Sequence, residues 1–107
     1  MRQRPQAVVD FTAIADFLHS ASPDASLKFI GAMESAYALL SAHPASGSTR
    51  HAFVLPELPA PLRFHPVQGF PRLLIYYLDL PEAVEVVRVW DAARGLDALL
   101  ENSGDPS

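Results

Sequence analysis

The sequence predicts an α+β fold in which a helical hairpin covers an antiparallel sheet. Residues 62–91 contain three short runs crowded with Ile, Val, Tyr and Phe, which is typical of strands. Only Gln68-Gly69 and residues 79–83 separate these runs. Connections this short join antiparallel neighbours, because a parallel return needs a dozen or more residues. Before Pro44, by contrast, apolar side chains recur at helical spacing.

The chain should begin with a short edge strand within residues 1–6. Pro5 limits its length, because proline is tolerated only at sheet edges or strand starts. This truncated strand leaves a sheet edge that is short or is filled by a partner. A first helix should follow and end near Ser20-Ala21. Its apolar stripe is formed by Val8, Phe11, Ile14, Ala15 and Leu18.

A second helix should begin at Ser22-Pro23-Asp24. Ser22 can cap it, proline suits the first helical position, and the acid complements the positive end of the helix. It should end before Pro44, whose ring disfavours helix at His43. The short connection between the helices predicts an antiparallel hairpin. The apolar face of this helix carries Leu27, Ile30, Met33, Tyr37 and Leu40.

After the hairpin, residues 45–48 should form a loop, and His51–Leu55 either a short strand or an extended lead-in to the meander. The pattern over residues 92–100 predicts a short C-terminal helix, and Gly95 opposes its backward continuation. We therefore expect one domain over residues 1–101 and a frayed tail over residues 102–107.

Composition narrows the function. A chain of 107 residues suits one domain, and its net charge of −4 argues against a dedicated nucleic-acid binder. No apolar run is long enough to span a bilayer or to serve as a signal peptide, so we expect the cytoplasm. The absence of cysteine excludes disulfides and thiolate metal sites. The four histidines have no metal-binding spacing, and the serines and glycines form no nucleophile elbow or phosphate loop. We assign no catalytic residue, metal or cofactor.

The two-residue period divides the predicted strands into two faces. We expect the helices to cover the face without arginine, which contains Leu62, Phe64, Leu73, Ile75, Tyr77, Val87 and Val89. The other face would then hold Arg63, His65, Arg72, Leu74, Tyr76, Arg88 and Trp90. Arginine mixed with aromatic rings resembles a protein-binding surface. A solvated sheet face with arginine stems lying on apolar surface explains the pattern equally well.

Arg88 is the most informative residue of the second face. A charge in a valine-rich strand is costly to bury unless it is paired. It should therefore meet an acid, such as Glu85 or Asp91, or face a partner. Its neighbour Trp90 fits a core position and an exposed anchor equally well.

The order of these elements and several short motifs resemble the RelE/ParE toxin superfamily, and its ParE branch more closely, over roughly residues 5–100. In the hairpin the resemblance rests on Pro5-Gln6-Ala7 with Asp10 and Ile14, on Ser22-Pro23, and on the P-x-x-G of residues 42–47. In the meander it rests on Leu62-Arg63, on Val67-Gln68-Gly69-Phe70-Pro71-Arg72-Leu73-Leu74-Ile75-Tyr76-Tyr77, and on Val86-Val87-Arg88-Val89-Trp90 followed by Arg94.

The resemblance implies an edge strand, a helical hairpin and a three-stranded antiparallel meander. It also implies a cognate antitoxin whose C-terminal segment wraps the toxin. Members of the ParE branch, which include plasmid stabilisation toxins, are associated with inhibition of DNA gyrase and growth arrest. Members of the RelE branch are associated with cleavage of mRNA on the ribosome.

RNA cleavage needs a base, an acid and a charge stabiliser at the phosphate. The RelE branch supplies these with lysines, arginines and a C-terminal tyrosine. Arg63 and Arg94 match arginine positions of that branch, but the meander has no lysine and no tyrosine follows Tyr77. Asp91, at the end of the last strand, would repel phosphate. The sequence therefore indicates a toxin that is not a nuclease.

The resulting hypothesis is a ParE-like toxin that acts by binding DNA gyrase and is neutralised by a ParD-like or other small DNA-binding antitoxin. It needs no membrane and no direct contact with nucleic acid, and a homodimer stays open. The alternatives are a RelE-like ribonuclease, a decayed binding module without toxicity, and an orphan α+β domain. Partner binding is assigned to Arg63, His65, Arg72, Tyr76, Arg88, Trp90 and Arg94.

Overall fold

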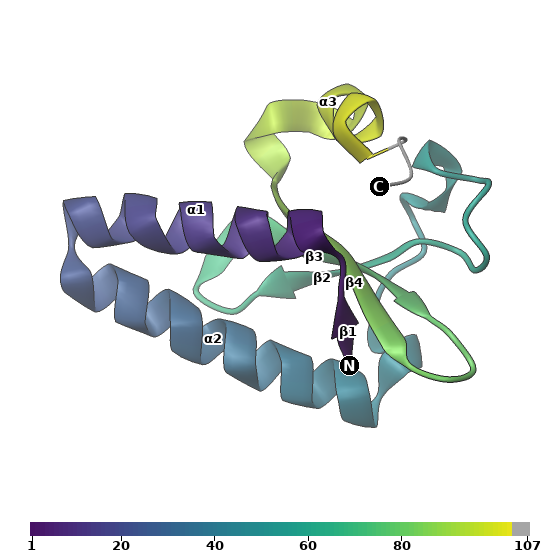
Figure 1. Cartoon of the computed structure of the whole chain (residues 1–107), viewed down its shortest axis with the longest axis horizontal. Helices are drawn as coiled ribbons and strands as arrows, with labels where there is room; N and C mark the ends of the chain where they lie inside the picture. The colour runs from purple at the N-terminus through teal and green to yellow at the C-terminus, as the bar shows by residue number, and fades with distance from the viewer. Residues whose placement is uncertain (104–107) are drawn as a thin grey trace.

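The structure, a computed structural model, describes residues 1–103 and has the predicted α+β architecture. A four-stranded sheet has the order β1-β4-β3-β2, and α1 and α2 pack side by side as an antiparallel hairpin (Figure 1). The helices are α1 (Pro5–Ala21), α2 (Pro23–Ala42) and α3 (Gly95–Ser103). The strands are β1 (Arg2–Gln3), β2 (Arg63–Val67), β3 (Phe70–Asp79) and β4 (Val84–Asp91).

The predicted boundaries of the hairpin are confirmed by the local chemistry. The Ser22 side chain accepts a hydrogen bond from the backbone N–H of Ala25, and Pro23 is the first residue of α2. The helix ends at Ala42, two residues before Pro44. The apolar stripes are each shifted slightly from the prediction. Val8 and Leu27 are exposed, and Ala7 of α1 and Phe29 of α2 are buried in the core in their place.

The meander also follows the sequence signals. Two residues join β2 to β3, and Gly69 occupies this turn with a φ of 85° that favours glycine. β3 ends at Asp79 and β4 begins at Val84, as expected for the second turn. The strands β2, β3 and β4 are antiparallel neighbours, whereas β1 pairs in parallel with β4 at the sheet edge.

The expectation of a strand or extended lead-in at His51–Leu55 is wrong. Ala52–Val54 instead forms a 3-10 turn, η2, in which the N–H of Val54 bonds to the carbonyl of His51. Ser48 already bridges the outer edge of β2 through both of its backbone groups to Phe64. The following residues therefore have no ladder to join, and they close local turns instead.

The C-terminal prediction holds in its essentials. A 3-10 turn, η3 (Ala92–Arg94), leads into α3, and Gly95 takes a φ of 80° where the chain changes direction. Of the tail predicted to fray, Asn102 and Ser103 belong to α3, and residues 104–107 lie outside the described residues.

The predicted division of the sheet into faces is wrong for β2. The register sets Arg63 opposite Tyr77, and Phe64 opposite Tyr76. Residues directly opposite each other share a face. Ile75 and Tyr77 pack under the hairpin, so Arg63 and His65 lie on that side as well. Leu62 and Phe64 pack with Tyr76 on the other side. The alternation of side chains within one strand does not show which of its two sides will face the helices, because that depends on its register with the neighbouring strand.

The prediction for Val87 is also wrong, because β4 contains a bulge. Tyr76 pairs with Arg88 and Tyr77 with Val86, so Val87 is an extra residue in β4. The inserted residue reverses the alternation. Val86 and Val89 both lie in the core cluster under the helices, whereas Val87 lies in the cluster on the other side.

Candidate functional site

The open face of arginines and rings predicted from the sequence does not exist as one surface. Tyr76 is fully buried, Trp90 is 1% exposed and Arg88 is 4% exposed. A second core cluster covers the rings from the 52–62 segment and from α3. Its buried members include Val54, Leu55, Leu62 and Leu99. The expectation failed because these apolar residues, which looked like connections, supply a second layer over the sheet.

Trp90 is therefore a core residue. Its ring nitrogen donates a hydrogen bond to the carbonyl of Gly95 at 3.2 Å, which ties β4 to the start of α3. The Arg94 guanidinium lies 4.1 Å from the centre of the same ring. Arg94 itself is exposed, and its guanidinium covers the buried Trp90 ring in a cation–π contact.

Arg88 pairs with Asp10 of α1, whereas the described ion pairs of Glu85 and Asp91 are with other arginines. Arg88 Nε lies 2.7 Å from Asp10 Oδ2, and a terminal nitrogen lies 2.9 Å from Oδ1. Asp10 Oδ2 also accepts the backbone N–H of Val89 at 3.0 Å. One carboxylate thus neutralises a buried guanidinium, satisfies an edge donor of β4 and holds α1 against the sheet.

Sequence reasoning missed Asp10 as a structural partner, although a signal was present. Asp10 lies three residues after Ala7 and four before Ile14, so it falls on the buried stripe of its helix. A carboxylate on a buried stripe and an arginine in a buried strand are costly apart. Together they form a bidentate pair.

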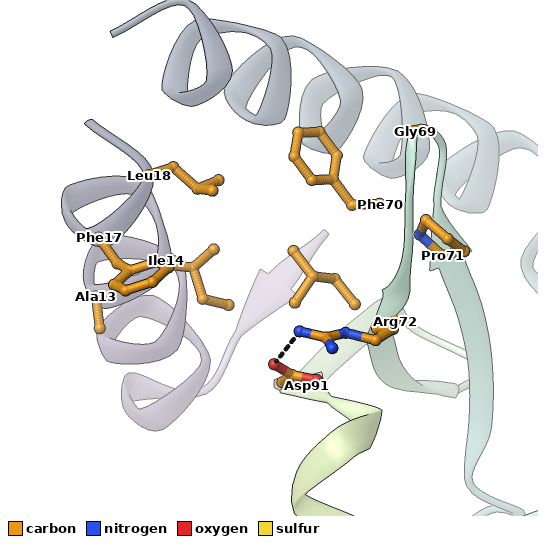
Figure 2. Close-up of a pocket in the computed structure, with 10 residues that line it drawn as sticks. Ala13, Ile14, Phe17, Leu18, Gly69, Phe70, Pro71, Arg72 and Asp91 are labelled. Carbon is orange, nitrogen blue, oxygen red and sulfur yellow. Dashed lines mark ion pairs between the residues drawn. The ribbon is translucent and has the colours of Figure 1, made fainter. Parts of the chain in front are cut away.

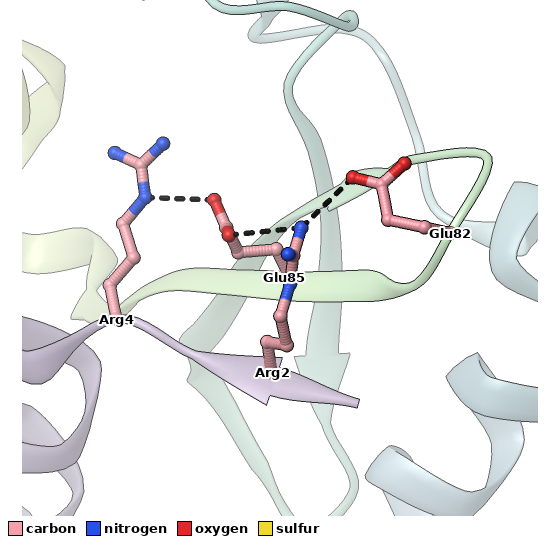
Figure 3. A network of polar contacts seen from close by, with 4 residues as sticks. All are labelled: Arg2, Arg4, Glu82 and Glu85. Atoms are coloured by element: carbon pink, nitrogen blue, oxygen red, sulfur yellow. Dashed lines mark hydrogen bonds and ion pairs between the residues drawn. The ribbon is translucent and has the colours of Figure 1, made fainter.

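The two acids proposed for Arg88 are engaged elsewhere. Asp91 pairs with Arg72. Glu85 binds Arg2 at 3.4 Å and Arg4 at 3.0 Å, and Arg2 also reaches Glu82 at 3.1 Å (Figure 3). This network and the Arg4 N–H, which donates to the carbonyl of Val86, hold the two-residue β1 beside β4. A strand this short has few ladder bonds, so its side chains provide much of its attachment.

Arg63 connects β2 to the loop that follows α2. It donates to the carbonyls of Ala45 at 3.1 Å and Gly47 at 2.9 Å. In the same loop the Tyr77 hydroxyl donates to the carbonyl of Pro44 and accepts the N–H of Gly47, each at 2.8 Å. Burial raises the pKa of this hydroxyl. The P-x-x-G motif is therefore the loop that receives Tyr77 and Arg63.

His51 anchors the segment over the second face. Its Nδ1 lies 2.8 Å from the Tyr76 hydroxyl, and its ring stacks on Phe64 with centroids 4.4 Å apart. Burial raises the pKa of Tyr76 to about 12, so its hydroxyl stays protonated. Burial, and then the charge of Arg50, lower the pKa of His51, which favours the neutral ring. In the tautomer protonated at Nε2, Nδ1 accepts the hydrogen bond from the Tyr76 hydroxyl.

Only part of the predicted partner-binding set reaches the surface. Arg72 and Arg94 are exposed, and Arg63 and His65 are half-buried. His65 lies beside Ser35 in a small cleft between β2 and α2. Tyr76, Arg88 and Trp90 are buried and support the surface from beneath. The structure thus divides the seven residues among several locations.

An apolar groove of about 500 Å³, here called the α1 groove, lies near these residues. Ile14, Phe17 and Leu18 form one wall, and the start of β3 forms the other with Phe70 and Leu73. The ion pair between Arg72 and Asp91, at 3.5 Å, lies at its rim (Figure 2). Phe17 is not among the predicted site residues; it lies beyond the buried stripe of α1 and is 72% exposed.

Across residues 1–99, whose side chains the structure describes, no group of three or more His, Cys, Asp or Glu side chains is placed to hold a metal ion. Within the same range, no helix is both long and apolar enough to cross a membrane.

Comparison with known proteins agrees with this architecture. A family model described as the ParE toxin of the type II toxin-antitoxin system, parDE, matches residues 1–96. None of the curated proteins compared with the chain matches it. The family match covers both helices of the hairpin, the whole sheet and the Arg88–Asp10 pair. The chain therefore belongs to the ParE toxin family of type II toxin-antitoxin systems, a membership that supports a toxin role and implies an antitoxin partner.

Proposed function

We propose that this protein arrests growth by binding DNA gyrase, without catalysing a reaction, and that a cognate antitoxin neutralises it. Family membership supports this proposal, because ParE-type toxins are generally non-enzymatic gyrase inhibitors. The toxin would act in the cytoplasm, where gyrase and DNA meet.

The engagement of the arginines is the observation that favours binding over ribonuclease chemistry. Arg88 is held by Asp10 in a buried bidentate pair, and Arg63 donates to two loop carbonyls. Arg72 pairs with Asp91. Cleavage of RNA requires cationic groups, a base and an acid that converge on one phosphate. These guanidinium groups are instead directed to separate internal acceptors.

The exposed members of the predicted set are the best candidates for partner contacts. Arg72 stands at the rim of the α1 groove with its side chain 74% exposed, and Arg94 covers Trp90. Arginine beside apolar or aromatic surface is typical of residues that contribute strongly to protein interfaces. Arg63 and His65 would contribute at the edge, and the buried residues would hold these contacts in position.

The test begins with induction of the chain alone in bacteria. We expect growth to stop and to recover when the cognate antitoxin is co-expressed. Purified protein should inhibit supercoiling by purified gyrase. Normal growth on induction would remove the toxin role, and growth arrest with unaffected supercoiling would remove gyrase as the target.

The same induction separates binding from nuclease activity. Messages mapped after induction should stay intact, whereas codon-positioned cuts would establish the RelE-like alternative. Arg94→Ala should weaken the inhibition of supercoiling several-fold. Arg50→Ala removes another exposed arginine and should leave inhibition unchanged. Equal effects of the two substitutions would contradict the assignment of Arg94.

A further inference from the structure

The backbone around Arg94 is held on both sides of this residue. Arg94 ends the η3 turn, between β4 and α3. One residue before it, the backbone N–H of Ala93 donates to the Asp91 side chain at 2.9 Å. One residue after it, the carbonyl of Gly95 accepts the Trp90 ring nitrogen at 3.2 Å. Both neighbours of this exposed arginine are therefore tied to the end of β4, which fixes the point from which its side chain leaves the backbone.

The guanidinium at the far end of the Arg94 side chain is held as well. Its central carbon lies 4.1 Å from the centre of the Trp90 ring, well inside the limit of about 6 Å for a cation–π contact. The ring occupies one side of the group. Because Arg94 is exposed, the rest of its five N–H donors can meet a ligand. The contact therefore restrains the guanidinium without covering it.

The ring that supports Arg94 is itself firmly placed. Trp90 is 1% exposed and belongs to the core cluster on the second face. The Arg88 guanidinium lies 4.9 Å from the centre of the same ring, and Asp10 holds Arg88 in a bidentate pair. Because Asp10 balances the charge of Arg88, the ring can accept a second cation with less repulsion. Contacts thus run without a break from α1 through the core to the surface at Arg94.

Arg94 also presents a positive charge that no nearby acid balances. Among residues 1–99, whose side chains the structure describes, no acid lies within ion-pair distance of Arg94, whereas an acid pairs with each of Arg2, Arg4 and Arg72. Arg50 is exposed and likewise unpaired within this range, but no cation–π contact holds it there. Arg94 therefore combines two properties, a restrained guanidinium and an unbalanced charge, and Arg50 has only the second.

We propose that Trp90 is a positioning residue, which holds the Arg94 guanidinium in place to bind a carboxylate of gyrase. This inference rests on the proposed function and names the chemistry of one of its contacts. A guanidinium that is already restrained loses little conformational freedom on binding, so more of the contact energy appears as affinity. Its planar N–H fork matches the two oxygens of a carboxylate.

The surroundings of Arg94 favour a single carboxylate over the phosphates of a nucleic acid. Sites for nucleic acids gather several cations along the backbone of the ligand. Here Arg94 lies between two acids in the chain, Asp91 and Asp97, and the charge of Arg72 is balanced by Asp91. The whole chain carries a net charge of −4. One acidic side chain of a protein can meet this group, whereas a chain of phosphates would be repelled.

The first experiment measures the restraint in the protein alone, by nitrogen-15 relaxation of the arginine Nε groups. In the native chain the Nε of Arg94 should be clearly more ordered on the ps–ns timescale than that of Arg50. Trp90→Leu should lower the order of Arg94 to that of Arg50. Trp90→Phe keeps an aromatic face and should preserve most of it. A native Arg94 as mobile as Arg50 would overturn the proposal, and this result requires no variant to fold.

The second experiment compares the protein concentrations that half-inhibit supercoiling by gyrase. Trp90→Leu should raise this concentration several-fold, as Arg94→Ala does, and Trp90→Phe less than twofold. In the Arg94→Ala background, Trp90→Leu should add less than twofold, because no guanidinium is left to position. Circular dichroism melts check that each variant folds. A loss from Trp90→Leu that is equal in both backgrounds would show a purely structural role and overturn the proposal.

Two further measurements test the chemistry of the ligand. Arg94→Lys keeps the charge but loses the planar fork, so inhibition should fall nearly as far as with Arg94→Ala. Full inhibition by the lysine variant would contradict recognition of a carboxylate by a guanidinium. The native chain should also bind purified gyrase in the absence of DNA. An affinity for a DNA duplex alone that depends on Arg94 would identify the ligand as phosphate and overturn the assignment.

Failure of this inference can be distinguished from failure of the proposed function. A native chain that does not inhibit gyrase would remove the proposed function and, with it, the carboxylate partner named here. A chain that inhibits gyrase, but whose Arg94 is equally ordered with and without the Trp90 ring, would overturn the inference alone.

Discussion

The two faces of the sheet are closed by different chemistry. Where the hairpin meets the sheet, polar groups are buried with their partners. Asp10 of α1 holds Arg88, whose side chain lies on the same side of the sheet as Tyr76 and Trp90. Tyr77 inserts its hydroxyl between Pro44 and Gly47 on the hairpin side. On the other side, aromatic rings are stacked under a turn and a short helix, and the central polar contact joins His51 to Tyr76.

This difference separates contacts that tolerate change from contacts that do not. Removing one member of a buried ion pair leaves the other member without that partner in a buried site, which is costly. Adding an atom at a glycine already in contact with a side chain forces that side chain to move. When a half-buried histidine beside solvent is substituted, water can take over its hydrogen bond. We therefore expect perturbations on the hairpin side to cost more stability than those on the second face.

The largest effect should follow Asp10→Ala. This substitution removes the carboxylate from a buried guanidinium and from the N–H of Val89, and losing one member of such a pair typically costs about 3–5 kcal/mol. Urea unfolding measures the change. Asp16→Ala removes an exposed acid from the same helix and should alter the free energy of unfolding by less than about 0.5 kcal/mol. Similar costs for the two variants would show that the pair does not anchor α1.

A somewhat smaller loss should follow Gly47→Ala. A Cβ at this position would overlap the Tyr77 hydroxyl, so the ring must shift and its bonds to the loop must break. Overpacking of this kind costs about 1–3 kcal/mol. Gly31→Ala makes the same chemical change in α2, where a Cβ meets no atom within 4 Å, and should stabilise by about 0.5–1 kcal/mol. A neutral Gly47→Ala would refute the tight fit between the loop and Tyr77.

The smallest effect should be the pH dependence that His51 brings to the second face. Its pKa in the folded chain lies below the ordinary value of 6.5, so the unfolded chain binds the proton more readily. The stability that neutral His51 provides is complete above the unfolded pKa and is lost as pH falls through the folded pKa. Unfolding midpoints of the native chain and of His51→Gln, measured between neutral and mildly acidic pH, should converge toward the acid end. A constant difference across this range would contradict a neutral His51 in the fold.

Local signals in the sequence predicted much of the architecture correctly. Ser22-Pro23 specifies a helix start through its own cap, and Gly69 marks a turn that needs positive φ. Such features depend on a few neighbouring residues, so they can be recognised without knowing the rest of the fold. The family resemblance was recognised by the same route, from short motifs in a fixed order, and the family match confirmed it.

The candidate site was predicted less well, because its residues lie far apart in the chain. The predicted set contained Arg88 and Trp90 but treated them as one surface with Arg63. The register of β2 separates them, because it sets Arg63 opposite Tyr77 on the hairpin side, whereas Arg88 and Trp90 lie opposite Tyr76 and Leu74. Asp10 is 78 residues from Arg88, and nothing in the local pattern of either segment names the other. Phe17 was not singled out because exposure depends on which helix face the sheet covers.

The sequence by itself therefore determined the kinds, order and limits of most elements, and it indicated the family. These properties arise from backbone preferences, capping and apolar periodicity within short segments. Only the tertiary structure decided which side chains share a face, which acid neutralises Arg88, and which rings are buried. The physical reason is that strand register and layer packing are settled between distant segments, and a shift of one residue exchanges the inside of a sheet with its outside.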